Sequence, residues 1–288
     1  MLKRNVPNSP RLLELKKERR KAIFGKIFLI FATFLVIFAS LAYVSRLEQL
    51  NIREIRITGN KVVEGEVIKE IVEEKIAGYY LWLVPKTNIL LYPKNNIKTE
   101  LQEKFRRLKN INLSVASNKV LGVTVTEREG LFIWCGDQLP EASTENKCYF
   151  VDENGYIFAE APYFSGEVYF KFYAPIDGTS DDPTGSYLLN GNFEKIILFK
   201  NALETMGLKP VALYAKDNNE IKLYLSKGKS LSMGPEIIFT IDADLENLAE
   251  NLETALSTEP LLSNFKNKYS SLEYIDLRYG NKVYYRFR

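Results

Sequence analysis

The stretch IFLIFATFLVIFASLAYV, at residues 27–44, runs for 18 residues without a charged side chain. As an α-helix it would be about 27 Å long, close to the thickness of the hydrocarbon core of a bilayer. Residues 1–26 before it carry nine Lys or Arg side chains but only two acidic ones, Glu14 and Glu18. By the positive-inside rule the basic flank stays in the cytoplasm and the rest of the chain is exported. We therefore expect a cytoplasmic basic tail at 1–26, a single transmembrane helix at 27–46, and an extracytoplasmic part after it.

A cleaved signal peptide is the alternative for this N-terminal region. Ser40-Leu41-Ala42 resembles the small-residue pattern at which such peptides are cut. However, the apolar region of a signal peptide usually has about 7–15 residues, and its basic lead is shorter than this one. We favour the uncleaved anchor.

The composition of the exported part narrows the possible functions. The residues after 26 carry 30 basic and 34 acidic side chains, and this mildly acidic balance argues against nucleic acid as a partner. The chain has no histidine, which excludes Ser-His-Asp and Cys-His catalysis and zinc sites built on histidine. Chemistry based on carboxylates alone or on a Ser-Lys pair remains possible. The aspartates Asp177, Asp181 and Asp182 lack the spacing of a calcium-binding loop, so we expect neither a metal nor a cofactor.

The two cysteines, Cys135 and Cys148, are flanked on their outer sides by strand-like residues at 131–134 and 149–151. The polar segment between them contains a proline and has no periodicity, which indicates a β-hairpin with a long loop. A disulfide at the base of this loop would close a ring of about 14 residues and stabilise the fold by about 3 kcal/mol in the chain-entropy model. Two free thiols are the alternative.

The first part of the exported chain, residues 50–128, alternates between the periodicities of strands and helices. Strands are predicted over 50–57, 111–115 and 121–125, and helices over 63–74 and 95–105. The predicted order is β-α-α-β-β.

An aromatic connector lies between the two predicted helices of this part. It contains Tyr79, Tyr80 and Trp82 and is interrupted by Pro85 and Pro93. We expect the three aromatic side chains to pack in the core or between helices; a membrane-surface patch is the alternative.

Residues 129–288 follow a different pattern, in which many short strands are separated by Gly, Asn, Asp and Pro. Strands are expected over 168–173, 211–215, 221–225, 237–241 and 274–279. Two helices interrupt them, at 193–206 and 244–256, the second with Asp244 placed to cap it. This part has about 160 residues and is long enough to bury a core of its own. The overall fold class is therefore α+β.

Five sequence blocks, taken in order behind one apolar stretch, resemble the bacterial division proteins of the FtsQ/DivIB family. They are IREIRITGN (52–60), VTVTER (123–128), VDENGYIF (151–158), IKLYLSKGKSLSMG (221–234) and YIDLRYGNKVYYR (274–286). The resemblance covers the whole chain and implies a POTRA domain at 50–128 followed by an FtsQ-type β domain at 129–288. The loop between Cys135 and Cys148 is a departure from the family's usual pattern.

The resemblance implies a scaffold without catalytic activity, located in the cytoplasmic membrane at the division septum. Proteins of this family bind the small bitopic proteins FtsB and FtsL. The last strands of the β domain are implicated in FtsB binding, and the POTRA domain is implicated in recruitment. FtsB-like and FtsL-like proteins are therefore the expected partners.

The C-terminal hairpin is the candidate site for that binding. Gly280-Asn281 is a two-residue hairpin signal, and the strand at 283–287 follows it. A terminal strand is often a sheet edge whose unpaired backbone groups accept another strand. The candidate partner-binding residues are Arg278, Tyr279, Val283, Tyr284, Tyr285, Arg286 and Phe287. A closing core strand that binds nothing is the alternative.

Three other functions fit the sequence less well. A membrane-anchored cell-wall enzyme would require a nucleophile motif such as S-x-x-K in a strand-turn-helix setting, whereas Ser226-Lys227 and Ser230 lie in a predicted turn between strands. An outer-membrane transporter with a POTRA domain would require a long series of amphipathic barrel strands. An extracytoplasmic binding module of another kind is the remaining alternative.

Overall fold

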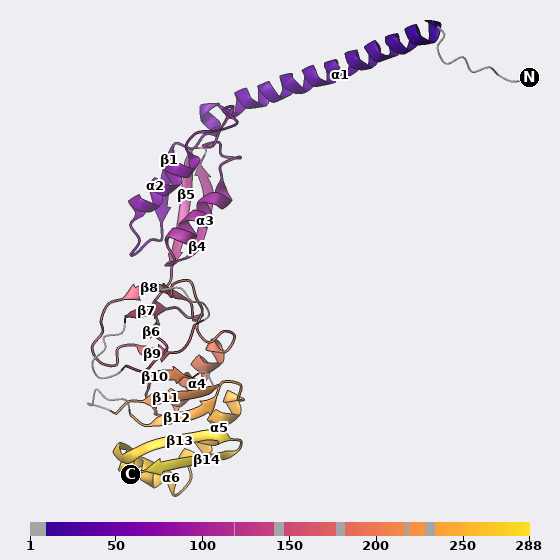
Figure 1. The fold of residues 1–288 in the computed structure, drawn as a ribbon. Helices are drawn as coiled ribbons and strands as arrows, with labels where there is room; N and C mark the ends of the chain where they lie inside the picture. The colour runs from indigo at the N-terminus through magenta and orange to yellow at the C-terminus, as the bar shows by residue number, and fades with distance from the viewer. Residues whose placement is uncertain (1–9, 118, 141–146, 177–181, 217–218, 228–233) are drawn as a thin grey trace, which may run out of the picture. The chain divides into compact units, whose positions relative to one another are not determined.

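The computed structural model of the chain describes residues 10–117, 119–140, 147–176, 182–216, 219–227 and 234–288. The start of the basic tail, residues 141–146 of the loop between the cysteines, and Asp177 and Asp181 lie outside these residues. The chain divides into two compact units, which we describe separately (Figure 1). Unit 1 comprises Met1–Glu103 and Asn110–Thr126, and unit 2 comprises Lys104–Lys109 and Glu127–Arg288.

The first element of unit 1 is the helix α1, Pro10–Ser45, which includes both the apolar stretch and much of the basic region before it. Among the described residues it is the one helix long and apolar enough to cross a membrane. Its length, composition and place near the N-terminus fit either a single membrane span or a signal sequence.

The rest of unit 1 has a small α+β fold. A three-stranded sheet has the order β1-β5-β4, with β1 (Glu54–Thr58) parallel to β5 (Val120–Glu127) and β4 at Leu108–Ser117. The helices α2 (Gly65–Ile76) and α3 (Lys94–Lys104) precede β4 in the chain. Their apolar stripes are buried, as are the inward-facing residues of the sheet; the core includes Ile68, Val72, Ile97, Leu101, Leu121 and Val123.

Two details of unit 1 differ from the sequence prediction. The strand expected from residue 50 begins only at Glu54, because Glu48–Leu50 forms a 3₁₀ turn at the end of α1. The connector after α2 contains a small hairpin of its own, β2 (Tyr79–Tyr80) with β3 (Val84–Pro85).

The aromatic residues of this connector are not in the core, so the expectation that they pack there is wrong. Tyr79, Tyr80 and Trp82 are all exposed, and the Trp82 side chain reaches 90% exposure. Tyr79 and Tyr80 form the short strand β2, and Trp82 follows in the turn before β3.

Within the described residues, unit 2 is built on a nine-stranded mixed sheet in the order β14-β13-β12-β11-β10-β9-β6-β7-β8. Three neighbouring pairs are parallel, β6–β9, β9–β10 and β12–β13, and the others are antiparallel. The strands are β6 (Phe132–Trp134), β7 (Cys148–Val151), β8 (Ile157–Ala161), β9 (Phe170–Tyr173), β10 (Pro210–Ala215), β11 (Glu220–Leu225), β12 (Glu236–Thr240), β13 (Leu272–Tyr279) and β14 (Lys282–Phe287).

Helices make the connection in two of the three parallel pairs. The helix α4 (Phe193–Thr205) joins β9 to β10, and α5 (Leu245–Leu256) with α6 (Leu261–Lys268) joins β12 to β13. Their apolar faces pack against the sheet to form one core. The Asp244 carboxylate accepts a hydrogen bond from the Asn247 N–H and caps α5, as predicted. The sequence prediction missed α6.

Unit 2 resumes at Glu127 and so includes Arg128. The Arg128 guanidinium pairs with the fully buried carboxylate of Asp152 and lies 4.0 Å from the centre of the Tyr156 ring. The Asp152 carboxylate also accepts the backbone N–H groups of Asn154 and Tyr156. A further ion pair joins Lys109 to Glu153 within the same unit.

Candidate functional site: the edge strand of the large sheet

The strand β14 lies at one end of the nine-stranded sheet, with β13 as its neighbour (Figure 1). The two strands form an antiparallel hairpin whose register pairs Tyr274 with Arg286 and Asp276 with Tyr284. The turn contains Gly280, whose φ of 65° lies in the left-handed region that glycine adopts without strain. Among the described residues no strand pairs with the other side of β14, so the sheet has an open edge there.

The side chains of β14 alternate between two environments, as a strand with one buried face requires. Val283, Tyr285 and Phe287 are half-buried and pack against the core of unit 2. Lys282, Tyr284 and Arg286 are exposed.

Two exposed tyrosines form a pair at the turn end of the hairpin. Tyr279 is 58% exposed and Tyr284 is 49% exposed. Their rings meet edge to face with centroids 5.1 Å apart, a favourable geometry for an aromatic pair. The pair presents apolar surface, together with two hydroxyl groups, next to the open backbone edge.

A network of ion pairs holds Arg278 beside this tyrosine pair. The guanidinium donates to both carboxylate oxygens of Asp276, at 2.9 and 2.6 Å, and to Glu220 on β11 at 2.6 Å. Asp276 is buried, with 6% of its surface exposed. Burial acts to raise the pKa of Asp276, but the hydrogen bonds and charge of Arg278 outweigh it and hold that pKa below its ordinary value. The same partnership raises the pKa of Arg278, so both groups stay ionised.

A second, more exposed pairing lies near the chain's end. The Glu273 carboxylate accepts from the guanidinium groups of Arg286 and Arg288, each at 3.1 Å. Both arginine side chains are exposed, so screening by water keeps this contact weak.

The hairpin thus brings together all seven residues proposed from the sequence, but with different roles. Arg278, Tyr279, Tyr284 and Arg286 lie on the surface, whereas Val283, Tyr285 and Phe287 pack inward. Substituting Tyr285 would therefore act mainly on stability. The sequence prediction missed two residues of this network. Asp276 could have been suggested, because it lies two positions before Arg278 in the same strand and so on the same face of the sheet. Glu220 could not, because it lies 58 residues from Arg278 along the chain.

Neither a scan against protein-family models nor a search of the curated proteins gives a match for this chain.

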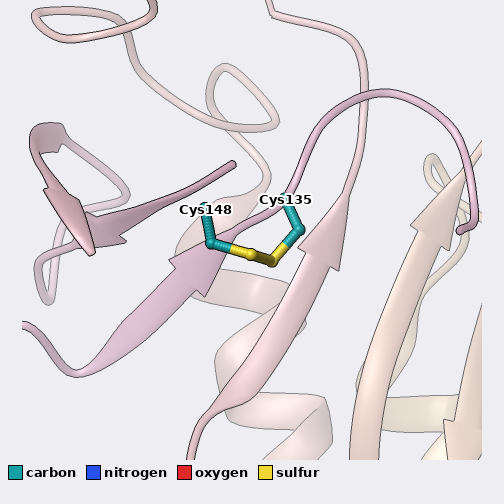
Figure 2. The surroundings of a disulfide bond; sticks show 2 residues. All are labelled: Cys135 and Cys148. Atoms are coloured by element: carbon teal, nitrogen blue, oxygen red, sulfur yellow. A yellow bond between two sulfur atoms is a disulfide. The ribbon is translucent and has the colours of Figure 1, made fainter. Parts of the chain in front are cut away.

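The cysteines form a second feature at the other half of the sheet. Cys135 and Cys148 are joined by a disulfide, with their Cα atoms 4.2 Å apart (Figure 2). The bond lies at the base of the loop between β6 and β7, just beyond the antiparallel pair of Trp134 and Tyr149. Cys135 is buried among Ile133, Tyr173 and Ala212. Its position inside a packed cluster suits a structural bond better than a redox-active one.

Proposed function

We propose that this chain is a non-enzymatic, single-pass scaffold of the bacterial division machinery, similar to FtsQ/DivIB proteins. In this proposal α1 crosses the cytoplasmic membrane with its basic end inside, and the part of unit 1 that follows α1 works outside the cytoplasm at the septum, together with unit 2. The part of unit 1 after α1 corresponds to the POTRA domain, and unit 2 corresponds to the β domain. The partners are FtsB-like and FtsL-like bitopic proteins.

The open edge of β14 is the observation that carries this proposal. A partner strand laid along it would form main-chain hydrogen bonds that depend little on side-chain identity. The exposed Tyr279–Tyr284 pair lies beside that edge and supplies the kind of aromatic surface that dominates binding energy at interfaces. The Arg278–Asp276–Glu220 network fixes the strand that bears Tyr279.

Co-purification of the full chain from its own membranes tests the proposal. We expect FtsB-like and FtsL-like proteins to be recovered with it. Tyr284→Ala and Tyr279→Ala should each weaken binding of the FtsB-like protein by about 1–3 kcal/mol, the usual range for an aromatic hot spot.

The matched control is Tyr163→Ala, since Tyr163 is 84% exposed in the loop after β8, at the other end of the sheet order. This variant should bind as the unchanged chain does. Equal loss in all three variants, or no loss in the two hairpin variants, would contradict the edge as the binding site. Recovery of unrelated extracytoplasmic proteins would instead favour a binding module of another kind.

A further inference from the structure

The turn of the β2–β3 hairpin presents a cluster of large apolar side chains that the fold does not bury. We call it the aromatic turn, and it comprises Tyr79, Tyr80, Leu81, Trp82 and Leu83. All five are exposed, including Leu81 at 80% and Trp82 at 90%. Leu90 and Leu91, a few residues later in the same connector, are exposed as well. Such a concentration of exposed apolar surface indicates an interaction site.

The backbone of the aromatic turn is unfavourable for the residues that occupy it. Leu81 and Trp82 have φ values of 46° and 59°, in the left-handed region where Gly or Asn is the usual choice. Glycine at these positions would relieve the strain and remove the exposed side chains together. The chain instead has two bulky, exposed side chains at these strained positions, which the stability of the fold does not explain.

The aromatic turn is bound to the end of α1. The Arg46 guanidinium, one residue beyond that helix, donates to the carbonyl oxygens of Leu83 (3.0 Å) and Trp82 (3.2 Å). The buried Asn88 amide donates to the Ser45 carbonyl at 3.1 Å. Two backbone hydrogen bonds, Ile52 N–H to Thr87 and Ile89 N–H to Leu50, join the same segments. These contacts fix the aromatic turn at the level where the apolar helix ends.

The position of the aromatic turn at the end of α1 indicates that its binding partner is the lipid headgroup region of the membrane. A helix that spans a bilayer ends at the headgroup region, where Trp and Tyr are enriched because their rings are apolar and their N–H and O–H groups are polar. Two cations flank the turn, with Arg46 5.9 Å from the centre of the Tyr79 ring and Lys86 5.9 Å from that of Tyr80. Both can meet lipid phosphates while the rings insert between headgroups.

We propose that the aromatic turn, with Leu90 and Leu91, is a membrane-interface anchor that inserts among the phospholipid headgroups of the leaflet from which α1 emerges. This inference rests on the membrane span in the proposed function. The anchor adds a second point of attachment besides α1, which would hold the β2–β3 hairpin against the membrane surface.

Tryptophan fluorescence of the full chain in lipid vesicles tests the anchor. The chain has two tryptophans, Trp82 and Trp134. Trp134 is half-buried in unit 2 and donates to the Ala174 carbonyl, so it serves as the internal reference. The full chain would be reconstituted in vesicles of equal parts phosphatidylethanolamine and phosphatidylglycerol, with or without bromine on the upper acyl chain. We expect brominated lipid to quench the Trp82 emission, and Trp82→Phe to abolish that quenched component.

Two outcomes would overturn the proposal in distinguishable ways. A chain that stays with the vesicles through an alkaline wash, but whose Trp82 emission is unquenched and as red as in water, rules out the anchor and leaves the span intact. A chain that the wash removes rules out the span and the anchor with it. Hydrogen exchange of residues 79–91, expected to slow in vesicles relative to detergent, gives a second readout that requires no substitution.

Discussion

At the scale of single residues, the Asp276–Arg278 pair combines a buried acid with a base that is only partly exposed. Asp276 keeps its charge inside unit 2 because Arg278 satisfies both of its oxygens. A buried carboxylate without such a partner costs several kcal/mol or takes up a proton. The stability of the β13–β14 hairpin, which carries the proposed binding site, therefore depends on the guanidinium of Arg278.

Replacing Arg278 with Met should destabilise unit 2 by about 2 kcal/mol near neutral pH, somewhat less than for a fully buried pair because a third of the Arg278 side chain is exposed. The folded-state pKa of Asp276 lies below its unfolded value, so its contribution is present above about pH 4 and is lost as the pH falls through the folded pKa. In the Arg278→Met variant, burial without a partner raises the pKa of Asp276 instead. The difference in unfolding free energy between the variant and the unchanged chain should therefore shrink toward acid pH. Urea unfolding at about pH 7 and about pH 4 measures both effects.

Arg286→Met is the matched control, because its partner Glu273 is shared with Arg288 and the Arg286 side chain is 66% exposed. We expect it to change stability by less than about 0.5 kcal/mol. The double variant Arg278→Met with Asp276→Asn should recover part of the loss, since the buried charge of Asp276 is removed together with its partner. A deficit in Arg278→Met that is the same at both pH values would contradict this account.

At the scale of secondary-structure elements, what could be predicted depended on whether the signal was local. The C-terminal hairpin followed from Gly280-Asn281, and α5 followed from its leucine spacing and the Asp244 cap. The helix α6 was missed because it has eight residues and a polar sequence, with only Leu261 and Phe265 four apart to mark its buried side.

The aromatic turn was placed wrongly for a different reason. The aromatic content of residues 79–83 predicts burial on average, but burial needs a neighbouring element to cover the side chains. Whether one exists is set by the tertiary arrangement and not by the local sequence. The same holds for the Glu220 carboxylate at Arg278, which β11 brings across the sheet.

The disulfide between β6 and β7 gives a prediction at this scale. Full-length protein isolated without reductant should show no added mass after alkylation. Reduction should lower the stability of unit 2 by about 3 kcal/mol, because it frees a loop of about 14 residues in the unfolded chain. Intact mass and urea unfolding with and without reductant provide the measurements. Cys135→Ala with Cys148→Ala is the control, whose stability should not respond to reductant; labelling of both thiols in the native sample would refute the bond.

At the scale of the whole molecule, the charge asymmetry around α1 predicts which way the chain is oriented. Residues 1–26 carry nine basic and two acidic side chains, and the 18 residues that follow carry no charge. A reporter that is active only outside the cytoplasm, fused after Arg288, should therefore be active. The matched control moves the same reporter to the N-terminus, where it should be silent. Activity of a cytoplasm-only reporter fused after Arg288 would reverse the orientation.

The open edge of β14 also has a consequence for the protein when no partner is present. Two copies could in principle pair their edges and start a continuous sheet, which is how exposed strands lead to aggregation. Lys282, Arg286 and Arg288 give this edge a positive character, which Glu273 offsets only in part. Two such edges laid side by side would repel each other, whereas a strand bearing acidic side chains would not. We therefore expect the same three cations to keep partner-free copies from pairing edge to edge and to select an acidic partner.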